Sequence, residues 1–143
     1  MTTRATYDDA NLILRLYEMR REERMRQARA WFTAKCKVKS YDELIKLAPG
    51  GSEENASFRM VVSYWDLVGS FITTGVLNKE LFFQSGRELL LVFERIREPL
   101  PSMREAYRDA NYLKHLETVG LQFAEYYRGQ SKEAYDAFLK RIK

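Results

Sequence analysis

The amino-acid sequence predicts an all-α protein that folds as a single domain over residues 1–143, with about five to seven helices around one central buried helix. Apolar residues recur at helical spacing through long segments, and no segment alternates apolar and polar residues for long enough to form a strand. Capping residues, glycines and prolines separate these segments, as they do in helical bundles.

The central helix is predicted over residues 53–74, with Ser52 as its N-cap and Glu53 in its first turn. Its apolar side chains cover an arc of roughly 220°, far wider than the ~100° stripe of a surface helix, so we expect it to pack on several sides. This arc contains Phe58, Met60, Val61, Val62, Tyr64, Trp65, Leu67, Val68, Phe71 and Ile72. The narrow polar strip that remains is centred on Asp66.

The first helix is predicted to begin within residues 6–9, where a hydroxyl and two acids suit an N-terminus, and to run to about Phe32. Leu14 begins an apolar stripe that Met25 and Ala28 continue. We therefore expect one long helix that buries this stripe.

A short second helix is predicted from Ser40, which forms a capping box with Glu43, to about Ala48. Residues 49–51, a proline and two glycines, then end it. The central helix follows directly.

The next helix is predicted over residues 79–98, with Asn78 as its N-cap and Gly86 at a close helix crossing. Pro99 and Pro101 interrupt the chain after it.

The C-terminal part is predicted to hold two further long helices. Ser102 and Glu105 form a capping box for a turn or short helix, which leads to a helix over residues 109–128. Ser131 then begins the final helix.

Composition limits the class of protein. The chain has 45% hydrophobic and 31% charged residues and only three prolines, which is typical of an ordered helical domain. Its one cysteine, Cys36, excludes an internal disulfide and fits a reducing compartment, so we expect a cytoplasmic protein. No apolar run approaches the roughly 20 residues needed to span a bilayer, so no transmembrane segment is expected.

Few residues in the chain suit catalysis or metal binding. With one histidine, His115, and one cysteine, the sequence lacks the ligands of a Cys/His zinc site or of a Glu-x-x-His di-iron site. We expect His115 to be a half-buried residue at the edge of the core. Cys36 lies among lysines, which lower thiol pKa values, so a reactive surface thiol is one hypothesis. No cofactor or metal is expected.

Asp66 is the sharpest candidate site residue, because an acid on a mostly buried helix needs a donor. Arg20, Arg21 and Arg24 lie on or beside the apolar sector of the first helix and lack acidic partners nearby in the sequence. We predict that one of them, or Arg59, lies close to Asp66. The favoured interpretation is an internal ion pair that fixes helix register; a polar ligand or active-site pocket is the alternative.

A second candidate is the basic segment over residues 20–39, where eight Lys or Arg residues face only two glutamates. One interpretation is a patch for nucleic acid or an anionic membrane surface. The favoured one is a solvated helix face, because no nucleic-acid-binding motif is present. The candidate patch residues are Arg26, Arg29, Lys35, Lys37 and Lys39.

Several short motifs resemble a bacterial family of small helical proteins known only as a domain of unknown function. The resemblance covers most of the span between Leu12 and Tyr112 and implies the helical fold, but it implies no activity. The motifs are Ala28-Arg29-x-Trp31-Phe32, Tyr64-Trp65-Asp66 with Gly69, Gly75-Val76-Leu77-Asn78 followed by Leu81-Phe82, and an arginine near Arg104.

The function that we expect is a non-catalytic cytoplasmic domain that binds another protein or a second copy of itself. Leu91 and Leu121 project from otherwise polar helix faces and are the candidate contact residues. Binding of nucleic acid or an anionic membrane surface through residues 20–39 is one alternative. An enzyme or small-ligand binder with a polar pocket near Asp66 is the other.

Overall fold

The computed structural model describes residues 4–143 and is all-α, as predicted. Within these residues the chain forms nine helices, against the five to seven expected. The helices are α1 (Tyr7–Arg20), α2 (Glu23–Lys35), α3 (Tyr41–Leu47), α4 (Glu53–Thr73), α5 (Lys79–Phe83), α6 (Arg87–Ile96), α7 (Leu100–Tyr107), α8 (Lys114–Gln130) and α9 (Lys132–Ile142).

The long first helix of the sequence prediction is broken into α1 and α2. Glu22 is the N-cap of α2, and its carboxylate accepts hydrogen bonds from the backbone N–H groups of Arg24 and Met25. Arg29 donates to the carbonyl of Arg20, at the end of α1. The side chain of Glu22 thus satisfies the start of one helix, while Arg29 satisfies the end of the other.

The helix predicted over residues 79–98 is also broken, into α5 and α6. Gly86 is the N-cap of α6, and a Cβ atom built on it would lie 2.3 Å from the ring of Phe82. The glycine therefore allows close contact with the Phe82 ring of the preceding helix, and not the predicted crossing of two helices. That contact redirects the chain at this point.

The boundaries of α7 and α8 differ from the predicted ones. Helix α7 begins at Leu100, directly after Pro99, so Ser102 and Glu105 lie inside it and form no capping box. Helix α8 begins at Lys114 instead of residue 109, after Leu113 in the left-handed region at φ 56°. The starts of α3, α4 and α9 at Ser40, Ser52 and Ser131 agree with prediction.

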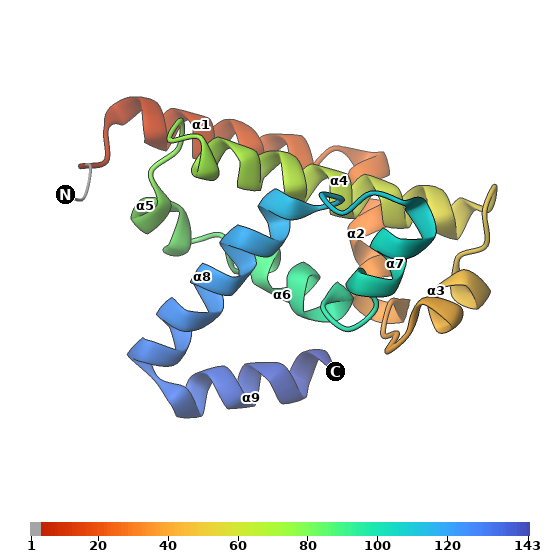
Figure 1. Ribbon diagram of the computed structural model, residues 1–143. Helices are drawn as coiled ribbons and strands as arrows, with labels where there is room; N and C mark the ends of the chain where they lie inside the picture. Colours follow the sequence, from red (N-terminus) through yellow and green to blue (C-terminus); the bar gives the residue numbers. More distant parts are fainter. Residues whose placement is uncertain (1–3) are drawn as a thin grey trace.

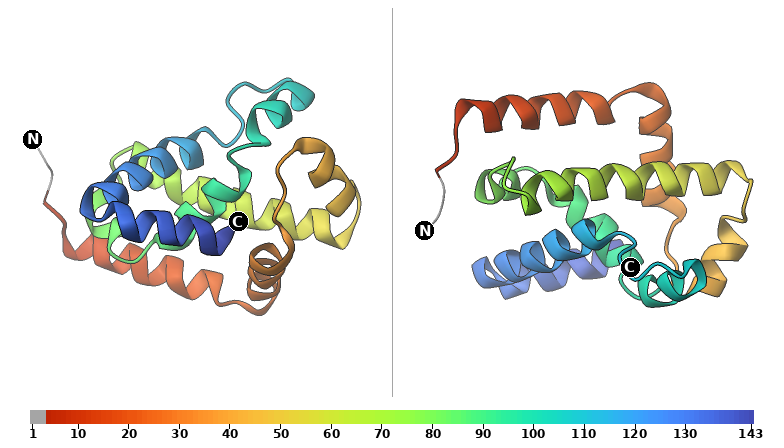
Figure 2. Two further views of the ribbon diagram at one scale, coloured as in Figure 1. Left: turned by 90° about the horizontal axis from the view of Figure 1, so that it is seen from below. Right: turned by 45° about the horizontal axis from the view of Figure 1, so that its top comes forward.

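Helix α4 lies at the centre of the structure, as the sequence predicts. It packs most extensively against α8 and α2. Figures 1 and 2 show α1 on one side of α4, and α8 with α9 on the other. Helices α3 and α7 pack together at one end, where the rings of Tyr41 and Tyr107 meet edge to face.

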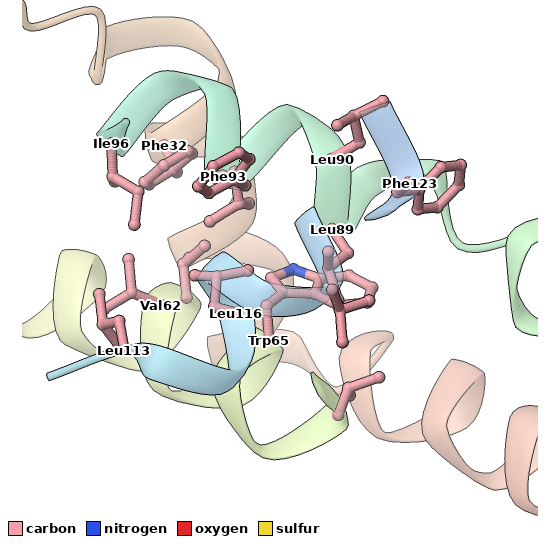
Figure 3. Packing of buried hydrophobic residues seen from close by; sticks show 14 of the residues in the cluster. Phe32, Val62, Trp65, Leu89, Leu90, Phe93, Ile96, Leu113, Leu116 and Phe123 are labelled. Carbon is pink, nitrogen blue, oxygen red and sulfur yellow. The ribbon is translucent and has the colours of Figure 1, made fainter. Parts of the chain in front are cut away.

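The hydrophobic core gathers around the inner face of α4. Trp65 is 2% exposed and lies between Leu116 of α8 and Leu89 of α6 (Figure 3). Phe32 of α2 stacks on Phe58, with ring centroids 6.2 Å apart. One contiguous core therefore joins helices from α1 to α9.

A buried arginine that the sequence did not single out joins three helices. Arg95 of α6 is 5% exposed and donates to the carbonyls of Phe32 and Cys36 at the end of α2, at 3.0 and 3.1 Å. It also donates to Thr33 and, at the end of α9, to Ile142. Its positive charge thus lies at the C-terminal ends of two helices, where their dipoles favour a cation.

Candidate interaction site

Asp66 binds the backbone of a neighbouring helix instead of an arginine. Its Oδ1 atom accepts a hydrogen bond of 2.9 Å from the N–H of Leu116, in the first turn of α8. Leu113, the N-cap residue of α8, has an apolar side chain that cannot accept a hydrogen bond from the helix. Asp66 therefore supplies the N-capping acceptor of α8 from α4.

The four arginines considered as partners of Asp66 all have other contacts. Arg20 lies over the rings of Tyr17 and Trp65, and Arg21 over Tyr17. Arg24 pairs with Glu53 at 3.4 Å and donates to Ser57. Arg59 donates to Asn55, one turn earlier on α4. Within the described residues, none of them forms an ion pair with Asp66, so the predicted pair is replaced by the helix cap.

The rest of the polar strip on α4 also supports the contact with α8. A Cβ atom on Gly69 would lie 2.8 Å from the carbonyl oxygen of His115, so the glycine allows the two backbones to approach closely. The Nδ1 atom of His115 and the hydroxyl of Thr73 are 2.8 Å apart and share a hydrogen bond. His115 is half-buried, in the position expected.

Four cavities in the described chain can be compared with the predicted polar pocket at Asp66. Neither Asp66 nor His115 lines any of them. Among residues 4–143 no group of three or more His, Cys, Asp or Glu side chains is arranged to hold a metal ion.

The candidate basic patch is divided in the structure. Arg29 turns inward and forms two 2.8 Å hydrogen bonds with the carboxylate of Glu88. This contact raises the Arg29 pKa. Arg26, Lys35, Lys37 and Lys39 remain exposed. The basic surface is therefore smaller than the sequence suggested.

Cys36 is buried, contrary to the hypothesis of a reactive surface thiol. It is 0% exposed at the end of α2, beside Arg95. Burial raises its pKa to about 12, although the charge of Arg95 opposes this shift. The thiol is protonated at neutral pH and is a packing residue.

Helix α1 is attached to the body largely by polar contacts. Only two of its residues, Asp9 and Leu16, are buried. Asp9 accepts from the backbone N–H groups of Thr6 and Asn78, at 2.8 and 2.9 Å, and these bonds lower its pKa. The hydroxyl of Tyr64 on α4 donates to the carbonyl of Leu16 at 2.5 Å. The end of α1 is held by Arg29, as described above.

One side of α1 carries an exposed apolar stripe. Tyr7, Leu14 and Tyr17 are 80%, 61% and 47% exposed, and their spacing places them on one side of the helix. We call these three residues the α1 stripe. The sequence prediction had buried Leu14 in a stripe continuing to Met25; the break between α1 and α2 separates the two.

The two leucines expected to be contact residues differ in exposure. Leu121 on α8 is 44% exposed. Leu91 is half-buried and packs against the core, so it offers little free surface.

An apolar cavity of about 330 Å³ lies beneath α1. Its wall on α1 includes Leu16 and Arg20 and, from the α1 stripe, Leu14 and Tyr17. Its wall on α4 includes Trp65 and Val68. Phe82 closes it from α5. We call this space the α1 cavity. Its walls come from four separate segments of the chain, so no local sequence pattern predicts it.

The residues that carried the family resemblance have structural roles here. Gly75 adopts φ 84° after α4, where an L-residue is disfavoured, and Asn78 caps α5. Arg104 donates to the carbonyl of Tyr112 at 2.9 Å and pairs with Glu117 at 3.0 Å, which holds α7 against the start of α8. These contacts set the turns between helices.

None of the helices in the described part of the chain has the length and apolar character needed to cross a membrane. A family model described as a domain of unknown function (DUF4760) matches residues 5–122. The chain belongs to this family. Comparisons with curated proteins and with solved structures gave no match.

Proposed function

We propose that this member of the DUF4760 family is a non-catalytic domain that acts by binding protein, and that its partner is a second copy of itself, bound through the α1 stripe. The observation that carries the proposal is the exposure of Tyr7, Leu14 and Tyr17 on one face of a helix with only two buried residues. A contiguous exposed apolar face marks an interaction site more often than scattered single residues do.

The spacing of the stripe supports contact with another helix. Tyr7 and Leu14 are one heptad apart and Tyr17 follows at the next inner position, the pattern by which two helices pack side by side. A twofold contact requires a surface that complements itself, and a stripe with an apolar residue near its middle meets this requirement, because Leu14 of one copy can face Leu14 of the other.

The charges along α1 favour an antiparallel arrangement. Exposed Asp8 lies at the N-terminal end, and exposed Arg15, Glu18 and Arg21 lie toward the C-terminal end, which is therefore net basic. In an antiparallel pair, the acidic end of one helix lies beside the basic end of its partner. Opposite charges at such positions select orientation more than they add affinity.

The proposed non-catalytic role is supported by the environments of the two residues best suited to nucleophilic or acid–base chemistry. Cys36 is buried with a raised pKa, and His115 is hydrogen-bonded to Thr73. The burial of Cys36 and the hydrogen bond of His115 give both residues a structural role. A cytoplasmic location remains part of the proposal, in keeping with a free cysteine.

Light scattering coupled to size-exclusion chromatography tests the proposal over a range of protein concentrations. We expect the wild-type mass to rise from monomer to dimer. Leu14→Lys places two lysines face to face and should abolish dimers, whereas the matched variant Leu121→Lys should not. A wild-type chain that stays monomeric, or a dimer lost only in Leu121→Lys, would contradict the proposal.

A charge exchange tests the orientation. Asp8→Lys alone and Arg21→Glu alone should each weaken the dimer by a few fold, and the double variant should recover most of the loss, because the two changes restore opposite charges across the contact. Equal loss in the single and double variants would exclude the antiparallel pairing.

A further inference from the structure

We infer that the α1 cavity is a binding site for an amphiphile with a single apolar chain and an anionic head, and that Arg20 binds the head. This site goes beyond the proposed self-association: Leu14 and Tyr17 of the α1 stripe border it, but its walls on α4 and α5 are not part of the stripe.

The cavity has the size and lining of a small-molecule site. Its volume of about 330 Å³ falls at the lower end of the range typical of ligand pockets, roughly 300–1,000 Å³. Leu16, Val68 and Phe82 give it apolar walls, and the buried ring of Trp65 forms part of the α4 side. Such a lining favours a hydrocarbon chain over a polar ligand.

Arg20 is the charged residue that lines this space. Its guanidinium carbon lies 4.9 Å from the Tyr17 ring centroid and 5.3 Å from that of Trp65. In the part of the chain that the structure describes, the guanidinium donates to no acceptor. A half-buried arginine with free donors beside an apolar cavity suits an anion, since it can offer a carboxylate or phosphate two parallel hydrogen bonds.

The nearby charges leave Arg20 available for such a head. Glu88 and Arg20 both lie close enough to Tyr64 for their charges to affect its pKa. The Glu88 carboxylate, however, accepts two hydrogen bonds from Arg29. Arg20 is thus not neutralised by the acid on that side. The site combines an apolar space with an uncompensated cation at its border.

The way α1 is attached gives a route for entry. Most of α1 is fixed by the polar contacts of Asp9, Tyr64 and Arg29, and Leu16 is its one buried apolar side chain. A small outward movement of α1 would therefore widen the cavity while breaking few fully buried apolar contacts. Segments with few buried apolar contacts open most readily.

Binding can be followed by the fluorescence of Trp65 in a Trp31→Phe background, which leaves one indole in the protein. The probes are decanoate, decyl phosphate, decan-1-ol and decyltrimethylammonium, each below the concentration at which it aggregates. We expect saturable binding of one decanoate or one decyl phosphate per chain, about fivefold or more tighter than decan-1-ol, because the anion gains charge-assisted hydrogen bonds. The tighter of the two anions identifies the head group.

Two variants assign the site. Arg20→Met keeps an apolar stem and should remove the preference for the anions without weakening decan-1-ol, whereas Arg21→Met should leave the preference intact. Ser85→Phe, at the exposed rim of the cavity, should block all four probes. If that variant fails to fold, the Trp65 indole N–H signal in the NMR spectrum gives the second test, because bound decanoate should shift it.

Several results would overturn the inference. They are the absence of saturable binding, equal affinity for the anions and decyltrimethylammonium, a preference for anions that survives Arg20→Met, and an unshifted Trp65 signal. Displacement of decanoate when the protein concentration is raised until it dimerises would also overturn it, because the second copy would then be the occupant of the cavity.

Discussion

Asp66 shows how one carboxylate can organise the contact between two helices. It lies half-buried on α4 and accepts from the N–H of Leu116, close to the positive end of the α8 dipole. Gly69, one turn further on, allows α8 to approach closely enough for this bond. The same strip of α4 thus provides both the acceptor and the space.

Replacement of Asp66 should destabilise the fold through this cap. We expect Asp66→Ala to lower the free energy of unfolding by about 1 kcal/mol and Asp66→Asn to lower it less, because an asparagine oxygen can also accept from a helix N-terminus. Urea denaturation followed by circular dichroism measures both. Glu125→Ala, at an exposed position on α8, is the control and should have little effect. An Asp66→Ala variant as stable as this control would contradict the capping role.

The buried thiol of Cys36 should react slowly in the native protein. Because burial raises its pKa to about 12, the thiolate is scarce at pH 8, and the native protein should react with Ellman's reagent far more slowly than the protein in urea. The absorbance of the released thiolate measures the rate. Rapid reaction of the native protein at pH 8 would show that Cys36 is accessible.

The need of Asp66 for a hydrogen-bond donor could be predicted from the sequence, but the identity of that donor could not. A helical wheel shows an acidic residue on a largely apolar helix, and such a residue requires a hydrogen-bond donor when it is covered. The donor is a backbone N–H of Leu116, and a backbone group carries no sequence signature. The buried position of Arg95 was not predicted for the same reason, since all four of its acceptors are backbone carbonyls.

Among the helices, α1 is far less buried than α4 and α8. Helix α4 has eight buried residues, whereas α1 has two. The N-terminal end of α1 depends on Asp9, whose carboxylate joins it to the start of α5 through Asn78. A change of pH that protonates Asp9 should therefore loosen α1 while the core stays folded.

The pH dependence of this attachment follows from the Asp9 pKa. Hydrogen bonds from the Thr6 and Asn78 backbones, in that order, lower the pKa below its ordinary value of 3.8. The stabilisation is therefore complete above that value and is lost as the pH falls through the lower, folded pKa. We expect amide hydrogen exchange in α1 to accelerate below about pH 4 relative to α4, after correction for intrinsic rates. In Asp9→Asn the exchange should already be faster at neutral pH and should lack this acid step. Equal protection of α1 in the two proteins at neutral pH would contradict the role of Asp9.

The breaks between helices show what local patterns omit. Arg21, Glu22 and Arg24 all favour helix, so their propensities do not predict a helix end at Arg20. The break is made by Glu22 capping α2 and by Arg29 reaching back to the Arg20 carbonyl. These contacts form only when α2 runs in a different direction from α1. A helical-wheel projection of one continuous helix therefore cannot show them. The serine caps of α3, α4 and α9 are local, and they were predicted correctly.

At the scale of the molecule, a polar centre on α6 connects α2 and α9. Arg95 binds carbonyls at the C-terminal ends of both helices, and its neighbour Glu94 accepts from Tyr135 of α9 and from Arg97. Glu94 and Arg95 are both buried, although they serve different partners. Helix α9 is therefore fixed to the bundle by hydrogen bonds as well as by the apolar face of Phe138.

Replacement of Arg95 should loosen both helices at once. We expect Arg95→Met to lower the free energy of unfolding by roughly 3 kcal/mol, because buried carbonyls lose their donors while the apolar stem is kept. Arg95→Lys should lose less, since an ammonium keeps the charge but cannot reach all four acceptors in the same planar geometry. Urea denaturation gives the free energy, and amide hydrogen exchange should show faster exchange in α9 and the last turn of α2. Arg141→Met, on the exposed side of α9, is the matched control. If Arg95→Met resembles this control, the apolar contacts of α9 hold it without the arginine; if only Arg95→Met frees α9, the buried cation is what joins the C-terminal helix to the first half of the chain.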